Sequence, residues 1–371
     1  MKTIDIKLSN HSYPVYMGNG LLSATELWRD HLGSGKTLIV SNDAIAPLYL
    51  EELKSALGNR AVEVHILPDG ERFKTVETWY GIVDKLVDMQ ARRDANLIAL
   101  GGGVVGDISG FAAACYMRGI RFLQVPTTLL AQVDASVGGK TAINHAKGKN
   151  LVGAFHQPVA VIIDPATLAS LPEREFNAGL AEVVKYGAIK DAGFFGWLEE
   201  NAAAIKQRHG DSLNYLIHES VKSKAEIVSQ DEKEAGVRAL LNFGHSFGHA
   251  IEAETNYSRY LHGEAVSIGM VIAARLSEIR DFCKPGTAKR LAALLHSLGL
   301  PVILPADISI NGLTGALALD KKAVVSGLRL VLLKATGDAV IDSQSSQHDI
   351  LAALERSVSQ EWVSQEWVNP E

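Results

Sequence analysis

The first half of the chain alternates short apolar runs with amphipathic segments. Apolar runs bounded by turn residues occupy positions 37–40, 61–67, 96–100, 122–125 and 160–163. Between them, apolar residues recur at three- and four-residue spacing, most clearly at 46–57 and 76–89. Strands separated by helices predict a mainly parallel sheet with crossover helices. Ligands of such sheets bind beyond the carboxyl ends of the strands.

The pattern changes after Pro172. From there to about residue 297 the chain reads as nearly all helical, with the clearest segments at 174–189, 211–229, 237–254 and 264–280. We therefore expect a first domain over 1–172, a second, mostly helical domain over 173–358, and a tail over 359–371. A hairpin is expected within 323–341, with Ser326-Gly327 and Thr336-Gly337 as turns. The tail contains Ser-Gln-Glu-Trp-Val twice, which is too short for a repeat architecture.

Composition narrows the class of protein. The chain has 371 residues, 47% of them hydrophobic and 21% charged, which is typical of a globular protein large enough for two domains. A net charge of −6 gives no reason to expect nucleic acid as a partner. The two cysteines, Cys115 and Cys283, lack metal-site spacing and are interpreted as reduced core thiols. Residues 1–10 contain no signal-peptide core, and no apolar stretch is long enough to cross a bilayer, so we expect a cytoplasmic protein without a membrane partner.

A glycine-rich turn follows the apolar run at 96–100. It reads Gly101-Gly102-Gly103-Val104-Val105-Gly106-Asp107 and leads into a helical pattern. Glycines let the backbone approach a pyrophosphate, and the free N–H groups at the start of a helix point toward it. A tight strand–helix turn is the alternative. Four glycines in six residues exceed what such a turn needs, which favours a nucleotide site.

Further polar groups follow the next predicted strand. Thr127 and Thr128 come directly after the run at 122–125. The segment Gly139-Lys140-Thr141 looks like the end of a P-loop, but Asp134 stands where that motif requires its first glycine, so an ATPase is rejected. Lys140, Lys149 and Asn150 lie beside glycines and suit an anionic substrate.

Three histidines are close together in the second half of the chain. His245 and His249 are four residues apart and share a helix face, and His262 follows. A catalytic zinc usually takes three protein ligands and leaves one position open. Glu182 is the candidate carboxylate, although Glu182 and Lys185 could also form an ordinary helical ion pair worth a few tenths of a kcal/mol.

Several motifs, in order, resemble the 3-dehydroquinate synthase family from about residue 14 to about residue 335. In the first domain these are Gly101-Gly102-Gly103-x-x-Gly106-Asp107, Tyr116-Met117-Arg118-Gly119, Pro126-Thr127-Thr128-Leu129-Leu130-Ala131-Gln132-Val133-Asp134, Gly138-Gly139-Lys140-Thr141 and Gly148-Lys149-Asn150-Leu151. In the second they are Ala181-Glu182-Val183-Val184-Lys185, Asp231-Glu232-x-Glu234, Leu241-Asn242-x-Gly244-His245 and His262-Gly263-Glu264. The resemblance implies a dehydroquinate synthase-like α/β fold: an N-terminal Rossmann-like, mainly parallel sheet domain that binds NAD, and a C-terminal, mostly α-helical domain that binds metal and substrate.

The family's functional positions carry over where the motifs match. The resemblance implies that zinc or cobalt binds to Glu182, His245 and His262. NAD contacts fall on Asn42, Glu71, Lys74, Gly102, Gly103, Val104, Asp107, Thr127, Thr128, Lys149 and Ser170. Substrate-binding and catalytic positions fall on Arg118, Asp134, Lys140, Asn150, Lys185, Lys224, Arg238, Asn242, His249 and one lysine of the Lys321-Lys322 pair, taken as Lys321. Two positions depart from the commonest pattern: Asn42 stands where the family often has Asp, and Ser170 where it has Thr.

The resemblance also implies the reaction. The substrate would be a phosphorylated seven-carbon sugar acid, 3-deoxy-D-arabino-heptulosonate 7-phosphate. Its C5 hydroxyl would bind the metal, which lowers the pKa of that hydroxyl and favours loss of the C5 hydride to NAD. Phosphate would then leave by elimination, the hydride would return, and an internal aldol step would close the ring to 3-dehydroquinate. The enzyme would thus be a carbon–oxygen lyase of the shikimate pathway, serving aromatic amino acid biosynthesis, and the resemblance implies a homodimer.

Three other functions fit parts of the sequence. A related cyclase that makes a cyclitol would share the scaffold, but Arg118, Asn150 and Arg238 suit a substrate with both a carboxylate and a phosphate. A metal-dependent polyol dehydrogenase would share the glycine-rich turn and would need no dense set of lysines and arginines. A catalytically inactive binding protein is disfavoured by the intact set of ligand residues.

Overall fold

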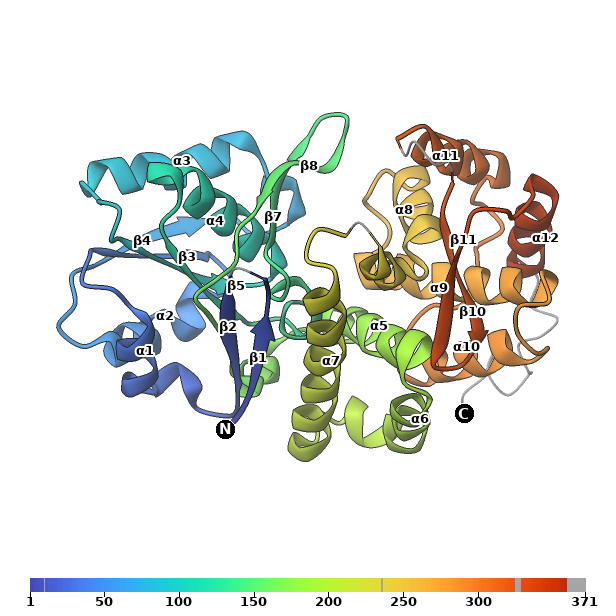
Figure 1. Cartoon of the computed structure of the whole chain (residues 1–371), viewed down its shortest axis with the longest axis horizontal. Coiled ribbons are helices and arrows are strands. Elements are labelled where there is room, and N and C mark those ends of the chain that lie inside the picture. The colour runs from blue at the N-terminus through green and yellow to red at the C-terminus, as the bar shows by residue number, and fades with distance from the viewer. Residues whose placement is uncertain (10, 235, 324–327, 359–371) are drawn as a thin grey trace. The chain divides into compact units, whose positions relative to one another are not determined.

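The computed structural model describes residues 1–9, 11–234, 236–323 and 328–358, without the side chains of 318–323. These residues form two compact units (Figure 1). The first contains Met1–Pro172 and Leu213–Lys233, and the second contains Glu173–Ser212 and the described residues from Glu234 on. The chain thus leaves the first unit at Pro172, where the sequence pattern changes, but Leu213–Lys233 returns to that unit.

A seven-stranded sheet forms the centre of the first unit, in the order β1-β2-β9-β6-β5-β3-β4. β1 and β2 are antiparallel, and every other neighbouring pair is parallel, as the α/β pattern predicts. The strands are β1 (Lys2–Lys7), β2 (Ser12–Met17), β3 (Thr37–Asn42), β4 (Val62–Leu67), β5 (Asn96–Gly101), β6 (Arg121–Pro126) and β9 (Ala160–Ile163). The helices of this unit are α1 (Thr25–His31), α2 (Ala46–Leu57), α3 (Val76–Asp88), α4 (Gly103–Cys115) and α7 (Gly210–Gln230). Short helical turns are η1 (Leu21–Ser23), η2 (Glu71–Phe73), η3 (Tyr116–Arg118), η4 (Ala131–Ala135) and η5 (Pro165–Ser170).

Both faces of this sheet are buried. Leu38 and Leu97 belong to a core cluster with residues of α3 and α4, whereas the next residues along each strand, Ile39 and Ile98, belong to a second cluster with residues of α1 and α2. Alternate side chains of a strand point to opposite faces. A strand covered on both faces therefore reads as a continuous apolar run, which is why β3, β5, β6 and β9 were visible in the sequence.

A two-stranded antiparallel sheet in the first unit was not predicted. It pairs β7 (Lys140–His145) with β8 (Gly148–Phe155). β8 is largely exposed, and its apolar residues Leu151, Val152 and Phe155 lie at the surface, so the short apolar run at 151–155 does not mark a buried strand. The β1–β2 pair was also missed, although residues 1–10 alternate charged and apolar side chains.

The described part of the second unit is mostly helical. Its helices are α5 (Glu173–Lys190), α6 (Ala192–Lys206), α8 (His245–Glu254), α9 (His262–Ile279), α10 (Thr287–Ser297), α11 (Ile310–Ala323) and α12 (Gln347–Val358), with η6 (Val237–Asn242) before α8. β10 (Leu330–Ala335) and β11 (Asp338–Asp342) form the expected antiparallel hairpin. Its turn includes Gly337, whose φ of 87° suits glycine. The other expected turn, Ser326-Gly327, and the tail over 359–371 lie outside the described residues.

Two expectations are wrong. The helix expected over 237–254 is broken, because Gly244 adopts a φ of 80° and separates η6 from α8. Cys115 is exposed at the end of α4, whereas Cys283 is buried as expected.

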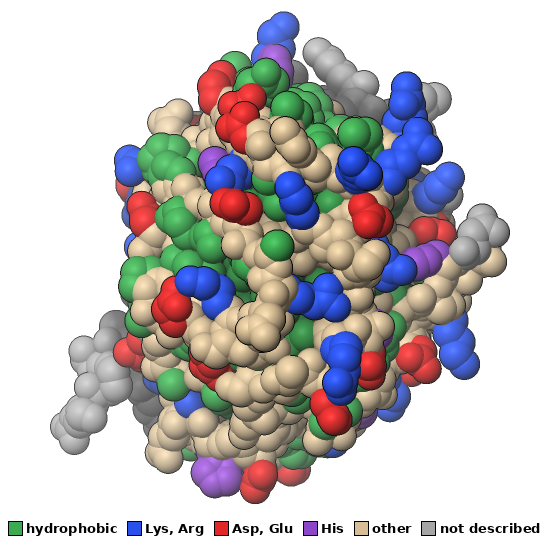
Figure 2. Space-filling view, turned by 90° about the vertical axis from the view of Figure 1, so that its left-hand side faces the viewer, with side chains coloured by type: hydrophobic (Ala, Val, Ile, Leu, Met, Phe, Trp, Pro, Cys, Tyr) green, Lys and Arg blue, Asp and Glu red, His purple; other side chains and the backbone are tan. Residues whose placement is uncertain are grey.

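The surface shown in Figure 2 carries interspersed charges of both signs. Among the helices described, none combines the length and apolar character needed to cross a bilayer.

Candidate active site

The glycine-rich turn joins β5 to α4 at the carboxyl edge of the sheet. Gly102 is the N-cap of α4. The preceding residue, Gly101, accepts a 3.0 Å hydrogen bond at its carbonyl from the N–H of Thr127, which directly follows β6. A Cβ on Gly102 would lie 3.0 Å from Thr128 Cγ2, so a larger residue would crowd this edge. The first turn of α4 therefore offers backbone N–H groups that suit a phosphate.

A buried lysine lies beside this turn. The Lys74 ammonium is 2.5 Å from both Asp107 Oδ2 and Asn150 Oδ1, and Lys74 is only 4% exposed. Burial raises the pKa of the Asp107 carboxyl, and the Lys74 ammonium opposes that rise. Asn150 adopts a φ of 56°, a conformation that costs a non-glycine residue free energy and is common at functional sites. The structure thus brings together the substrate candidate Asn150 and the NAD candidates Lys74 and Asp107.

The remaining NAD candidates lie in the same unit. Glu71 Oε1 accepts a hydrogen bond from Asn144 Nδ2 at 2.7 Å, and Ser170 Oγ is 2.6 Å from the Tyr49 hydroxyl. Gly103 and Val104 begin α4, Thr128 precedes η4, and Lys149 lies on β8. Asn42 ends β3 and is only 6% exposed.

The metal candidates lie on three helices of the second unit, and glycines allow these helices to pack closely. Glu182 is on α5, His245 begins α8, and His262 begins α9. A Cβ at Gly263 would lie 1.9 Å from the Ala178 carbonyl oxygen of α5, so only glycine allows α9 to approach that helix so closely. At Gly244, before α8, a Cβ would lie 2.4 Å from Met270 Cγ of α9.

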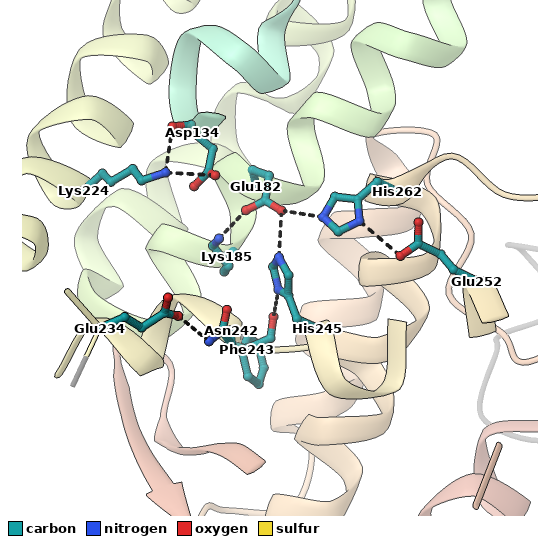
Figure 3. A network of polar contacts seen from close by, with 10 residues as sticks. All are labelled: Asp134, Glu182, Lys185, Lys224, Glu234, Asn242, Phe243, His245, Glu252 and His262. Carbon is teal, nitrogen blue, oxygen red and sulfur yellow. Dashed lines mark hydrogen bonds and ion pairs between the residues drawn. The ribbon is translucent and has the colours of Figure 1, made fainter. Parts of the chain in front are cut away.

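These three side chains converge on one point (Figure 3). Glu182 Oε1 is 3.4 Å from His245 Nε2 and 3.8 Å from His262 Nε2. One ligand atom from each residue lies within 4.8 Å of the others. Two imidazole nitrogens and a carboxylate oxygen form a donor set that suits zinc or cobalt. The residues present therefore fit the predicted metal.

Glu182 also forms an ion pair with Lys185, one turn further along α5 (Figure 3). Both side chains are only 2% exposed. Burying two charges costs several kcal/mol of desolvation per ion, so this pair differs from the ordinary surface pair considered from the sequence.

The first unit supplies four further substrate candidates besides Asn150. Lys224 Nζ of α7 is 2.9 Å from Asp134 Oδ2 and 2.7 Å from the Asp134 carbonyl oxygen. Arg118 is exposed at the end of η3, where Met117 and Arg118 adopt φ values of 50° and 65°. Two successive left-handed residues are costly, so Arg118 lies at a strained, tight turn of the backbone. Lys140 begins β7 and is exposed.

The second unit supplies the others. Arg238, in η6, is only 1% exposed, which is unusual for an arginine. Asn242 Nδ2 donates to Glu234 Oε1 across 2.8 Å. His249 is exposed, with its ring centroid 5.6 Å from that of His245 and 5.8 Å from that of His262. The backbone of Lys321 belongs to α11, but its side chain lies outside the described residues.

Two residues that the sequence analysis did not select contact its candidates. Glu252, on α8, is 2% exposed and lies 3.3 Å from His262 Nδ1. Asp69, after β4, accepts a hydrogen bond from Asn42. Glu252 is seven residues after His245, a spacing that places both on one helix face and could have drawn attention to it. No comparable spacing marks Asp69.

The chain is similar to known proteins over nearly its whole length. The family profiles described as 3-dehydroquinate synthase N-terminal and 3-dehydroquinate synthase C-terminal match residues 64–178 and 179–323. The chain is 49% identical to the 3-dehydroquinate synthase of Azotobacter vinelandii over 355 residues, which is 96% of this chain and 97% of that protein. It is also 49% identical to the 3-dehydroquinate synthase of Halorhodospira halophila over 358 residues, 96% of this chain and all of that protein.

Solved structures of sugar phosphate cyclases share the fold. The 2-epi-5-epi-valiolone synthase of Streptomyces hygroscopicus, solved with NAD+ and Zn2+, matches with a TM-score of 0.88 and 32% identity over 96% of this chain and 99% of that one. A glycerol dehydrogenase from Schizosaccharomyces pombe, at 15% identity and a TM-score of 0.62 over 96% of this chain and 92% of that one, shares the fold alone. The matched profiles and the 49% identity over nearly the whole length establish that the chain belongs to the 3-dehydroquinate synthase family.

Proposed function

We propose that the chain converts 3-deoxy-D-arabino-heptulosonate 7-phosphate to 3-dehydroquinate and phosphate. The observation that carries this proposal is the convergence of Glu182, His245 and His262, in a chain that belongs to this family. The same cluster in a protein that lacked the candidate lysines and arginines would suit simpler alcohol oxidation.

The first unit has the features of an NAD site. The N-terminus of α4 would hold the pyrophosphate, because its free N–H groups follow a turn of small residues. The hydroxyls of Thr127 and Thr128 lie at the end of the neighbouring strand. Lys74, fixed between Asp107 and Asn150, would keep a positive charge close to the cofactor and the substrate.

The second unit would hold a zinc or cobalt ion through Glu182, His245 and His262. A metal held there would supply a Lewis acid for a substrate hydroxyl, and bound NAD would supply a hydride acceptor that is regenerated, so the overall reaction would have no net redox change. Lys185 neutralises part of the charge of the buried Glu182 carboxylate. His249 is exposed and one turn after His245, where it can accept and release protons.

Cationic and amide groups would hold the substrate. Arg118 and Lys140 are exposed in the first unit and suit the phosphate or the carboxylate through charge-assisted hydrogen bonds. In the second unit, Arg238 and Asn242 would bind the substrate. Their number fits an enzyme that must keep one small anion oriented through several successive steps.

We also propose that 1–172 acts mainly in NAD binding and that 173–358 acts mainly in metal and substrate binding. We expect a cytoplasmic homodimer, as the family resemblance implies. Analytical ultracentrifugation would measure the oligomeric state directly.

One assay separates this function from its rivals. Purified protein is stripped of metal and nucleotide, then incubated with the heptulosonate phosphate, NAD and Zn2+ or Co2+, each omitted in turn. We expect phosphate and dehydroquinate in equal amounts, without accumulated NADH, and only when NAD and metal are both present. Cyclitol formation from a sugar phosphate without a carboxylate would identify a different cyclase, and net NADH from a polyol would identify a dehydrogenase.

A further inference from the structure

Both metal-ligand histidines are anchored through the nitrogen that faces away from Glu182. His245 Nδ1 is 3.2 Å from the Phe243 carbonyl oxygen, and His262 Nδ1 is 3.3 Å from Glu252 Oε2 (Figure 3). A neutral imidazole carries its proton on one nitrogen and a lone pair on the other. Acceptors at both Nδ1 atoms assign the protons there, so both Nε2 lone pairs face Glu182.

The two anchors differ in chemistry. The carbonyl beside His245 is backbone and is fixed by the turn that precedes α8, whereas Glu252 is a carboxylate that is only 2% exposed. A buried carboxylate is costly unless it is hydrogen-bonded. Glu252 also lies two helical turns after His245, so α8 supplies one ligand directly and supports the other from the same face.

We propose that Glu252 is a positioning residue for the metal site. Its carboxylate accepts the Nδ1–H of His262, fixes the orientation and tautomer of that ring, and increases the electron density at Nε2. This role rests on the proposed metal site. In this arrangement Glu252 supports a metal ligand and is not itself one.

A competing arrangement uses the same atoms. His249, Glu252 and His262 also bring one ligand atom each within 4.8 Å of the others and could hold a second cation. That cation would need the lone pair of His262 Nδ1, the nitrogen that donates to Glu252 in our proposal. One neutral imidazole cannot donate and ligate through the same nitrogen, so the two arrangements exclude each other.

The test measures metal affinity rather than activity. Zn2+ is titrated into metal-free protein in competition with a chromophoric chelator, and stoichiometry is measured by elemental analysis. We expect one ion per chain in the unaltered protein. Glu252→Ala should weaken affinity by about 10–100-fold. Glu252→Gln should recover part of that loss, because an amide oxygen still accepts a hydrogen bond but carries no charge. Glu254→Ala, which removes an exposed carboxylate from the same helix, should match the unaltered protein.

A second measurement reports the tautomer directly. Nitrogen NMR of labelled histidine in metal-free protein should show His262 protonated at Nδ1, and Glu252→Gln should shift the balance toward Nε2. Unchanged affinity and an unchanged tautomer in the Gln variant would overturn the proposal even if the Ala variant does not fold. Two ions per chain, reduced to one in the Gln or Ala variant, would establish the competing arrangement. Failure of the unaltered protein to bind Zn2+ would instead overturn the proposed metal site itself.

Discussion

The side-chain amide of Asn42, at the end of β3, donates a hydrogen bond to the carboxylate of Asp69 across 2.6 Å. The amide oxygen of Asn42 meanwhile accepts the backbone N–H of Ile45 at 2.9 Å, before α2. Both ends of this side chain are therefore engaged within the protein. Two carboxylates, Asp43 after β3 and Asp69 after β4, are exposed at this edge of the sheet. Asp69, which contacts Asn42, can supply the negative charge that the family often places at position 42.

We predict that NAD is preferred over NADP and that Asp69 contributes to the preference. A carboxylate near the adenosine ribose can accept hydroxyl hydrogen bonds and repels a 2′-phosphate. Asp69→Asn should improve NADP binding about fivefold, on the order of 1 kcal/mol for one exposed like charge. Isothermal titration of nucleotide-free protein with each dinucleotide measures this, with Asp88→Asn as an exposed control on α3. Equal or tighter binding of NADP by the unaltered protein would show that the carboxylates at this edge of the sheet do not discriminate against a 2′-phosphate.

The metal assignment predicts a specific loss for His245→Ala. Removing one of three ligands should abolish stoichiometric zinc and activity together, while the circular dichroism of the protein stays unchanged. His348→Ala is the matched control, because His348 is exposed on α12. Elemental analysis of dialysed protein decides the point: one zinc per chain retained in His245→Ala would mean that the ligands are wrongly assigned.

Arg118 and Lys140 should bind substrate anions rather than serve as solvated surface charges. Loss of a charge-assisted contact to phosphate or carboxylate costs about 1.5–3 kcal/mol, so each Ala variant should lose tenfold or more in kcat/KM. Exposed Arg93→Ala should change kcat/KM little. If both variants have the same kcat/KM as the Arg93 control, Arg118 and Lys140 do not bind the substrate.

The sequence predicted most of what local patterns control. The five predicted strands, β3, β4, β5, β6 and β9, and helices α2 and α3 lie within a residue or two of their expected positions. Strands covered on both faces, such as β3 and β5, need apolar runs, and helices need a 3.6-residue period. It also selected Glu182, His245 and His262, which the structure brings together. The ligands come from three helices, and only the resemblance to a family indicated that these helices meet.

What the sequence missed depends on tertiary contacts. β8 is exposed although residues 151–155 are apolar or glycine, so its apolar run did not indicate a core strand. The break before α8 depends on Gly244, which packs against Met270 of α9. Glu252 looked like one more glutamate on an amphipathic helix, and its significance lies in a contact with a residue on α9. The role predicted for Asp69 likewise depends on its hydrogen bond with Asn42, which is distant in sequence.

Three partly buried histidines of the first unit predict acid sensitivity. Burial is the largest influence on His31, His65 and His156, and in each it lowers the pKa of the imidazole below its usual value. Above about pH 6.5 these groups are neutral in both the folded and the unfolded chain. As the pH falls below about 6.5, the unfolded chain binds protons that the folded chain does not, so the free energy of unfolding decreases.

His156 offers the cleanest test of this effect. Its Nε2 is 3.0 Å from the Ile120 carbonyl oxygen, and a glutamine amide could donate the same hydrogen bond without titrating. We expect His156→Gln to lose less stability than the unaltered protein between about pH 7 and pH 5, a range that spans the usual histidine pKa. Thermal unfolding midpoints of both proteins, measured without metal, give the difference. Without metal, the pH dependence of metal binding does not contribute to the stability of either protein. His348→Gln, at an exposed site, should keep the original pH dependence. If His156→Gln also keeps it, the acid sensitivity arises from other groups, and His156 gains its proton in the folded state as readily as in the unfolded chain.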